Sequence, residues 1–293
     1  MAKGRFLAID WGTTNRRVYV MDGDGLVLAT ARDDRGIKSV AAGGWSTELA
    51  GLRARFGDLP ALVAGMVGST RGWIEVPYVM APAGVAELAA GLGHVAGERF
   101  AIVPGVACNG ADERPDVMRG EEVQAVGAAL AGLTPGDALF CQPGTHNKWI
   151  TLEGGRIVRI TTAMTGELFA LLRDHSILAE MMGGRVADGA AFREGLADAA
   201  EGDLLSRLFG IRASVLLGRR MAGDGAAYAS GLLIGSDVAA RDVAGRAVHI
   251  LSDPNLGPLY ATAIAHFGGT ATEIDGQAAF LAGIHHIRSM IDD

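Results

Sequence analysis

The sequence predicts an α/β protein built from two similar halves. A strand–turn–strand pattern covers residues 6–20, and the same pattern returns 132 positions later at residues 138–152. Between the repeats, short buried strands alternate with helices, which is typical of α/β folds. The gap-free matches at the two turns are Gly12 with Gly144, Thr13 with Thr145, Asn15 with Asn147, and Arg16 with Lys148.

The first half begins with three antiparallel strands. Hydrophobic residues alternate across residues 6–10 and 18–20, and the segment 22–25 (Asp-Gly-Asp-Gly) predicts a hairpin before a third strand at residues 26–28. Helices are expected at residues 45–56 and 83–92, and short buried strands at 61–64 and 100–103. A domain boundary is expected near residue 115.

The second half starts with an apolar helix at residues 121–133, and a turn at 134–137 leads into the second strand–turn–strand unit. From Thr165 onward the pattern is mostly helical. The expected helices cover residues 167–182, 187–200, 204–209, 226–240, 256–267 and 277–291, with a strand at 247–251. The predicted domains are therefore residues 1–115 and 116–293, with the last helix a candidate to pack back onto the first domain.

Composition excludes several classes of protein. The 293 residues are 49% hydrophobic and 20% charged, as in a well-packed soluble globule. With 26 Lys and Arg against 33 Asp and Glu, the net charge is -7, so there is no basic field for a nucleic acid or an anionic membrane. No apolar run approaches the ~18 residues of a membrane helix. The first strand leaves no room for a signal peptide, so we expect a cytoplasmic protein.

The paired glycine turns predict a phosphate site. Glycine permits a tight turn in which backbone N–H groups approach an anion closely. Asp10 ends the strand before the first turn, where a carboxylate can hold Mg²⁺ while the turn binds phosphate. The alternative is an aspartate that merely caps a hairpin. Neither a P-loop string nor a Rossmann glycine fingerprint occurs in the sequence.

Five segments in order resemble one known family. The duplicated turns are similar to those of the sugar kinase, hexokinase, actin and Hsp70 superfamily, and nearly the whole chain resembles the 2-dehydro-3-deoxygalactonokinase family. The segments that carry this resemblance are Asp10–Arg17, Gly65–Trp73, Pro115–Glu122, Pro143–Trp149 and Met164–Phe169.

The resemblance implies two ribonuclease H-like (actin-like ATPase) domains, each a mixed sheet flanked by helices, with a cleft between them. It also implies ATP-dependent phosphorylation of 2-dehydro-3-deoxy-D-galactonate at its 6-hydroxyl, with ATP and Mg²⁺ as cofactors. Asp10 is the expected metal ligand and one of the catalytic residues. The residues expected at the nucleotide are Gly12, Thr13, Thr14, Arg16, Gly144, Thr145, Asn147 and Lys148.

The acceptor hydroxyl needs a carboxylate that takes its proton. Glu121, Glu122 and Asp116 are the candidates. The resemblance favours Glu121, because in related kinases the base often precedes a small-residue helix that leads into the second phosphate turn. The alternative is that acidic residues here only favour the N-terminus of a helix.

The substrate carboxylate calls for arginine, whose planar fork can bind both oxygens. Arg71 and Arg119 are the candidates, and a loop that also holds Ser69 and Trp73 could form a polyol pocket. The alternative for this loop is a surface loop with a buried tryptophan. Thr165 and Glu167, in the fifth segment, are also expected at the substrate.

Several alternatives stay open. A kinase of the same fold that acts on another sugar or 2-keto-3-deoxy acid is the nearest one, and a sugar-responsive regulator is remote. The residues around the adenine are left open, because the segment 251–256 lacks the glycine that such kinases often carry there. Among the histidines, only His146 is close to the predicted chemistry. The oligomeric state is open, with a homodimer as one option.

Overall fold

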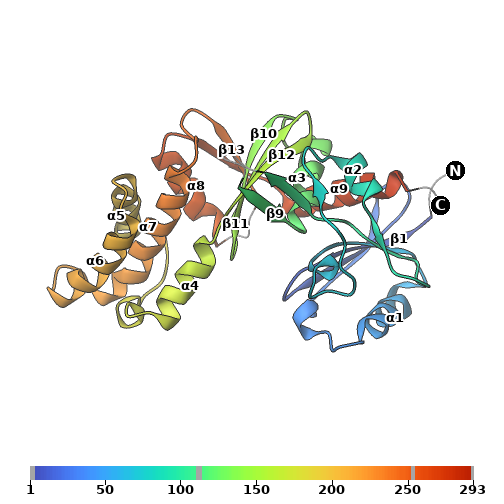
Figure 1. Ribbon diagram of the computed structural model, residues 1–293, viewed down its shortest axis with the longest axis horizontal. Helices are drawn as coiled ribbons and strands as arrows, with labels where there is room; N and C mark the ends of the chain where they lie inside the picture. Colours follow the sequence, from blue (N-terminus) through green and yellow to red (C-terminus); the bar gives the residue numbers. More distant parts are fainter. Residues whose placement is uncertain (1–3, 110–113, 252–254, 292–293) are drawn as a thin grey trace. The chain divides into compact units, whose positions relative to one another are not determined.

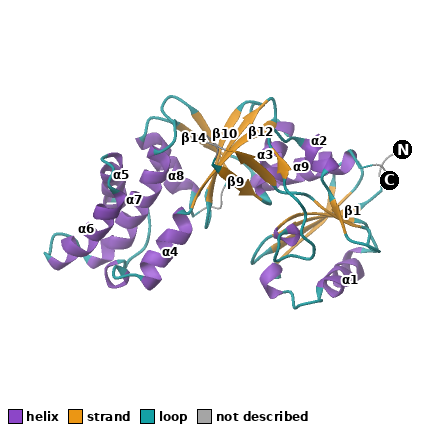
Figure 2. Ribbon diagram, viewed as in Figure 1, coloured by secondary structure: helices purple, strands orange, loops and turns teal. Residues whose placement is uncertain are grey.

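A computed structural model describes residues 4–109, 114–251 and 255–291. The chain folds into strands and helices that follow one another along the sequence (Figures 1 and 2). By contacts it divides into two compact units: Met1–Asp137 with Ile150–Ile160 and Asp275–Asp293, and Ala138–Trp149 with Thr161–Ile274. Along the chain, the first unit therefore gives way to the second after Asp137. The domain boundary near residue 115 stays a prediction.

The first sheet has six strands in the order β3-β2-β1-β4-β7-β6. They are β1 (Phe6–Trp11), β2 (Arg16–Met21), β3 (Val27–Asp33), β4 (Ala61–Gly65), β6 (Gly93–His94) and β7 (Phe100–Ile102). Strands β1, β2 and β3 are antiparallel as predicted, and β4 and β7 continue the sheet parallel to β1. Apolar side chains on β1 and β4 are buried, because helices and loops cover the sheet.

The helices of the first unit are α1 (Trp45–Phe56), α2 (Val85–Ala90), α3 (Glu121–Leu130) and α9 (Gly276–Ser289). Helix α9 lies beside α3 although their sequence positions are far apart (Figure 1). A Cβ on Gly127 would lie 1.9 Å from the Ala279 carbonyl oxygen, so only glycine allows this close approach. The side chain of Asp275 caps α9 by accepting bonds from the N–H groups of Gln277 and Ala278.

A small sheet, β5-β8-β9, was not predicted. Its strands are β5 (Val79–Met80), β8 (Val106–Asn109) and β9 (Pro115–Met118). Strand β9 pairs antiparallel with β8 and leads directly to the N-terminus of α3. These strands are only two to four residues long, which is too short for a hydrophobic alternation to reveal.

The second large sheet repeats the strand order of the first. Its order is β12-β11-β10-β13-β14, which corresponds to β3-β2-β1-β4-β7. The strands are β10 (Ala138–Gln142), β11 (Asn147–Glu153), β12 (Arg156–Ala163), β13 (Ala247–Ile250) and β14 (Thr270–Glu273). Strands β13 and β14 run parallel to β10. The repeated order confirms the α/β fold class expected from the duplicated turns.

Among the described residues, the first unit has the α-helix α1 between β3 and β4, whereas the second unit carries several helices between the corresponding strands β12 and β13. They are α4 (Thr165–His175), α5 (Ala190–Ala200), α6 (Leu204–Leu216) and α7 (Gly225–Ala239), and α8 (Gly257–His266) follows β13. Helix α5 crosses α7 closely, since a Cβ on Gly231 would lie 2.0 Å from the Phe192 carbonyl oxygen. Figure 2 shows this helical region in purple.

Two predicted helix ends differ most from the structure. The helix expected at 167–182 ends at His175, because Ser176 is extended and a short 3-10 helix, Ala179–Met181, follows it. The helix expected at 204–209 continues to Leu216, since Gly210 is accommodated inside it. In the part of the chain that the structure describes, no helix has the length and apolar character needed to cross a membrane.

Candidate active site

The first glycine turn is held by a neighbouring loop. The N–H of Gly12 donates to the Asn15 carbonyl oxygen at 2.9 Å, and the N–H of Ile37 donates to the Gly12 carbonyl oxygen at 3.0 Å. A Cβ on Gly36 would lie 2.4 Å from the Thr13 carbonyl oxygen, so this position needs glycine. The loop fixes the conformation of the turn, and sequence reasoning missed Gly36 because its role depends on a contact far along the chain.

Asp10 lies at the end of β1, next to this turn. Its carboxylate forms an ion pair with the guanidinium of Arg17, with 3.3 Å between Oδ2 and Nη1. Burial raises the pKa of Asp10, and the positive charge of Arg17 opposes that shift. Residues 10 and 17 are cross-strand neighbours in the first hairpin.

Arg16 is buried, with 4% of its surface exposed. Its guanidinium binds Asp33 through two bonds of 2.7 and 3.2 Å, and Glu48 through a third of 3.0 Å. Glu48 also pairs with Arg35, which with Arg16 lowers the pKa of that carboxyl group. The geometry therefore favours a structural role for Arg16, and its contact with phosphate stays a prediction.

The second glycine turn packs against the N-terminus of α4. The N–H of Glu167 donates to the Thr145 carbonyl oxygen at 2.9 Å, and a Cβ on Gly166 would lie 2.4 Å from the Gly144 carbonyl oxygen. His146 Nε2 lies 2.5 Å from Glu167 Oε2, and both side chains are more than a third exposed. The turn therefore presents a histidine–carboxylate pair together with the Thr145 hydroxyl.

Lys148 and Asn147, which follow the second turn, are buried. Lys148 Nζ donates to Thr162 Oγ1 at 2.7 Å. Asn147 Nδ2 donates to Asp237 Oδ2 at 2.6 Å, and the Cys141 thiol donates to Asn147 Oδ1 at 3.4 Å. Both side chains thus connect the start of β11, which follows the turn, to neighbouring elements.

Asp237, near the C-terminal end of α7, accepts hydrogen bonds from five side chains. They are Asn147, Trp149, Thr165, Arg241 and Tyr260, with donor–acceptor distances between 2.6 and 3.4 Å. Sequence reasoning missed Asp237. The available signal was a single acidic residue in an otherwise apolar helical stretch, where an unpaired charge would be costly.

An apolar pocket of about 190 Å³ lies within the second unit beside the second turn. Its lining includes Gly144 of the turn, Thr165 and Phe169 of α4, Ile234 of α7 and Tyr260 of α8. Asn255 and Leu256 also line it, so the segment 251–256 does reach the pocket, although residues 252–254 lie outside the described residues.

Arg119 is buried in the first unit, with 8% of its surface exposed. Its guanidinium stacks over the ring of Tyr78, 4.4 Å from the centroid, and Nη2 donates to the Val76 carbonyl oxygen at 2.7 Å. Among the described residues, neither Nε nor Nη1 of Arg119 has a hydrogen-bond partner. A Cβ on Gly68 would lie 2.9 Å from Nη1, so glycine leaves room there for the guanidinium.

The loop that holds Ser69, Arg71 and Trp73 is folded onto itself. Ser69 Oγ donates to the Met66 carbonyl oxygen at 2.7 Å, and Arg71 is exposed. Trp73 stacks against Trp45 and contacts Phe100, with ring centroids 6.2 and 4.8 Å apart. Trp73 is thus half-buried against the core, which is also the alternative that the sequence left open.

The three candidate carboxylates lie around the start of α3. Asp116 Oδ1 accepts the Val117 N–H at 2.7 Å, and Glu121 Oε2 accepts the Arg119 N–H at 3.1 Å. Glu122 is fully buried, and its Oε2 accepts the Gly120 N–H at 2.6 Å. Burial and the charge of Glu121 raise the pKa of Glu122 to about 8.

Comparison with known proteins assigns the family. The model of the 2-keto-3-deoxy-galactonokinase family matches residues 10–287. The chain belongs to this family. It is 35% identical to the 2-dehydro-3-deoxygalactonokinase of Escherichia coli (strain K12) over 289 residues, which cover 97% of both chains. It is 37% identical to DgoK1 of Rhizobium meliloti (strain 1021), a probable enzyme of the same name, over 295 residues, 96% of this chain and 95% of the relative.

A solved structure supports the same assignment. The crystal structure of a Sinorhizobium meliloti protein described under the 2-dehydro-3-deoxygalactonokinase name superposes with a TM-score of 0.88. It is 36% identical and covers 96% of this chain and 97% of its own. The family resemblance inferred from the five sequence segments is therefore confirmed.

In this galactonokinase family member, the predicted site residues fall into two groups. Asp10, the first turn, Arg119 and the α3 carboxylates belong to the first unit, and the second turn, Thr165 and Glu167 belong to the second. That the two turns face one another stays a prediction. No group of three or more metal-ligating side chains occurs among the described residues, so Asp10 would supply a single carboxylate.

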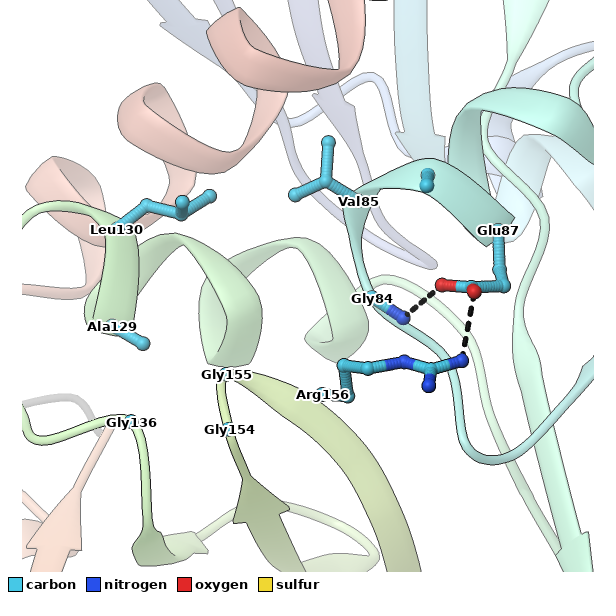
Figure 3. Close-up of a pocket in the computed structure, with 10 residues that line it drawn as sticks. Gly84, Val85, Glu87, Ala129, Leu130, Gly136, Gly154, Gly155 and Arg156 are labelled. Carbon is cyan, nitrogen blue, oxygen red and sulfur yellow. Dashed lines mark hydrogen bonds and ion pairs between the residues drawn. The ribbon is translucent and has the colours of Figure 1, made fainter.

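A larger hollow of about 560 Å³ lies within the first unit, and its lining residues include none from either glycine turn (Figure 3). Glycines 84, 136, 154 and 155 form much of its wall, and Arg156 pairs with Glu87 at 2.7 Å near the N-terminus of α2. Glu87 also accepts the Gly84 N–H at 2.8 Å, so both charged side chains are already engaged. This hollow is not a candidate active site.

Proposed function

We propose that this protein transfers the γ-phosphoryl group of ATP to the 6-hydroxyl of 2-dehydro-3-deoxy-D-galactonate, which yields 2-dehydro-3-deoxy-6-phosphogalactonate. It is a phosphotransferase with an alcohol group as acceptor. The match of the family over residues 10–287 carries this proposal.

The nucleotide side of the site is assigned to the second unit. The apolar pocket has the character of an adenine site, since it is lined by aliphatic and aromatic side chains and opens beside Gly144. The Thr145 hydroxyl and the backbone of the turn would bind phosphate oxygens, as glycine turns do. Asn147 and Lys148 are buried behind the turn and would support it, while exposed His146 adds a donor at its surface.

Asp10 is assigned to the metal, and the Thr13 and Thr14 hydroxyls of the first turn to phosphate oxygens. Mg²⁺ is usually held by one or two carboxylates together with phosphate oxygens and water, so a single carboxylate at the end of β1 fits it. When bound, the ion would neutralise charge on the transferring phosphoryl group. The chain's own contribution is to hold the Asp10 carboxylate in place through Arg17.

Arg119 is assigned to the carboxylate of the sugar acid. Stacking on the ring of Tyr78 holds the guanidinium in place. Among the described residues, two of its buried N–H donors have no protein partner. Leaving such donors unpaired is costly, and a carboxylate oxygen of the ligand would satisfy either of them. Ser69 and Arg71 would contact the polyol, while the packing of Trp73 supports their loop.

Glu121 is assigned to the general base, with Asp116 and Glu122 as the alternatives. The carboxylate of Glu121 is half-buried at the first turn of α3 and would accept the proton of the 6-hydroxyl. General-base help of this kind accelerates a reaction by roughly 10²–10⁴. Contacts of Thr165 and Glu167 with the sugar acid stay predictions, as does a homodimer.

A coupled assay of ADP release tests this proposal. The panel would contain 2-dehydro-3-deoxy-D-galactonate, its gluconate epimer, simple aldonates and neutral sugars. We expect the highest kcat/KM for the galactonate derivative. A higher value for a neutral sugar would reassign the enzyme to another acceptor, and no ADP release with any acceptor would reject the kinase function.

A further inference from the structure

Asp237 is connected to both parts of the site assigned to the nucleotide. Its Oδ2 accepts Asn147 Nδ2 at 2.6 Å, directly behind the second turn. The same oxygen accepts Thr165 Oγ1 at 3.2 Å and Tyr260 Oη at 3.4 Å, and these two residues line the apolar pocket. One carboxylate oxygen therefore joins the turn to the pocket wall.

The other oxygen of Asp237 anchors this arrangement. Oδ1 accepts Trp149 Nε1 at 3.0 Å and pairs at 3.0 Å with Nη2 of Arg241, which follows the end of α7. The Asp237 side chain is 3% exposed. Five donors, from β11, α4, α8 and the segment that follows α7, thus meet at one buried charge.

A buried carboxylate at this position is unfavourable for stability. Burying a charge costs free energy that its partners only partly return, and an apolar side chain of similar volume often serves stability equally well. The carboxylate instead fixes the orientation of its partners, because each of the five donors must point at one of its two oxygens. The bond from Asn147 also fixes the orientation of that amide, whose oxygen receives the Cys141 thiol.

We propose that Asp237 is the positioning residue that fixes the second phosphate turn relative to the wall of the apolar pocket, and thereby determines the affinity for the nucleotide. This inference rests on the proposed function, which places the nucleotide at that turn and pocket. Asp237 touches no reacting atom and acts only through Asn147, Thr165 and Tyr260.

The experiment compares Asp237→Asn with a matched control, Asp198→Asn. Asp198 is also a helical carboxylate of the second unit; it accepts the Tyr228 hydroxyl at 2.5 Å and pairs with Arg207 at 3.3 Å, but it does not line the pocket. Calorimetry would measure the Kd for ATP, steady-state assays would measure KM for ATP and for the sugar acid, and thermal unfolding would measure Tm.

We expect Asp237→Asn to raise the Kd and KM for ATP by about 10-fold or more, the effect of losing hydrogen bonds to a charged group, and to raise the KM for the sugar acid by less. Asp198→Asn should lower Tm and leave the Kd for ATP unchanged. An unchanged Kd in Asp237→Asn, or an equal rise in both variants, would overturn the inference.

Thr165→Val is the second variant, in case Asp237→Asn does not fold. It removes one of the bonds to Asp237 with little change in side-chain volume, and we expect a smaller rise in the Kd for ATP. An unchanged Kd in Thr165→Val would then count against the inference. If the wild-type protein binds ATP but does not phosphorylate the sugar acid, the proposed substrate is wrong and the role of Asp237 is still decided by the Kd values. If the wild-type protein does not bind ATP, both are rejected.

Discussion

The carboxylate of Asp10 and the guanidinium of Arg17 lie 3.3 Å apart, side by side on neighbouring strands. The pair stands at the end of β1, where the first glycine turn begins. Arg17 opposes the rise in the pKa of Asp10 that burial causes, so it favours the ionised carboxylate that a metal ligand requires.

Replacing Asp10 by Asn tests the metal role. The amide has nearly the same shape but lacks the charge that binds Mg²⁺, so we expect kcat to fall on the order of 10²–10³. The Tm should change little. Steady-state rates across a series of Mg²⁺ concentrations would measure the effect, and near-normal turnover would discredit the role.

Arg17→Met is the matched control for that prediction. It removes the ion pair that holds the Asp10 carboxylate but keeps the carboxylate itself, so turnover should fall less than in Asp10→Asn. If Arg17→Met lost as much activity as Asp10→Asn, the loss would be due to the broken pair, and the metal role of Asp10 would lose its support.

Arg16 gives a second prediction, because its environment differs from what the sequence suggested. In Arg16→Met, Asp33 and Glu48 lose their buried cation, and we expect the free energy of unfolding to fall by about 3 kcal/mol. The KM for ATP of the folded variant should stay close to that of the wild type. Urea unfolding and kinetics well below Tm would measure both, and a large rise in KM would restore the phosphate role.

Glu122 gives a prediction about pH. Its pKa is about 8 in the folded protein, above the ordinary value of 4.5. The folded state therefore keeps a proton that the unfolded chain releases between these two values, and stability falls as the pH rises from about 4.5 to about 8. Glu122→Gln cannot release this proton, so the part of the pH dependence that Glu122 causes should disappear.

Urea unfolding of both proteins at pH 5.5 and pH 8 would measure this difference. From pH 5.5 to pH 8, we expect the free energy of unfolding of Glu122→Gln to rise by roughly 3 kcal/mol relative to that of the wild type. Parallel pH profiles for the two proteins would mean that Glu122 is not held protonated by its surroundings.

Arg119 gives a prediction about the acceptor. Lysine keeps the charge but lacks the planar fork, so Arg119→Lys should raise the KM for the sugar acid by about 10- to 100-fold with little change in the KM for ATP. Arg71→Ala is the comparison, because Arg71 is exposed in the neighbouring loop. A larger effect in Arg71→Ala would move the carboxylate contact to that residue.

Much of the fold could be predicted from the sequence, since the strands around both turns have clear hydrophobic alternation and α1 was predicted at its exact bounds, Trp45–Phe56. The short strands β5, β6, β8, β9 and β14 were not predicted, because two to four residues carry too little pattern. The end of α4 at His175 depends on the local conformation at Ser176, which no periodicity shows.

The site was harder to predict than the fold. Motifs located the turns, and the family, but they could not show that Arg16 is enclosed by Asp33 and Glu48, because those residues come from distant segments. Asp237 was missed for the same reason, since its five donors converge only after the second unit has folded. A single sequence shows that a residue is polar, and only the folded chain shows which partners it has.

The most direct test of the central claim is phosphorus NMR of the product formed from ATP and 2-dehydro-3-deoxy-D-galactonate. We predict one phosphate monoester for each ADP released, with its phosphorus coupled to the protons on C6. Release of ADP with inorganic phosphate alone, or a phosphate coupled to another carbon, would contradict the account.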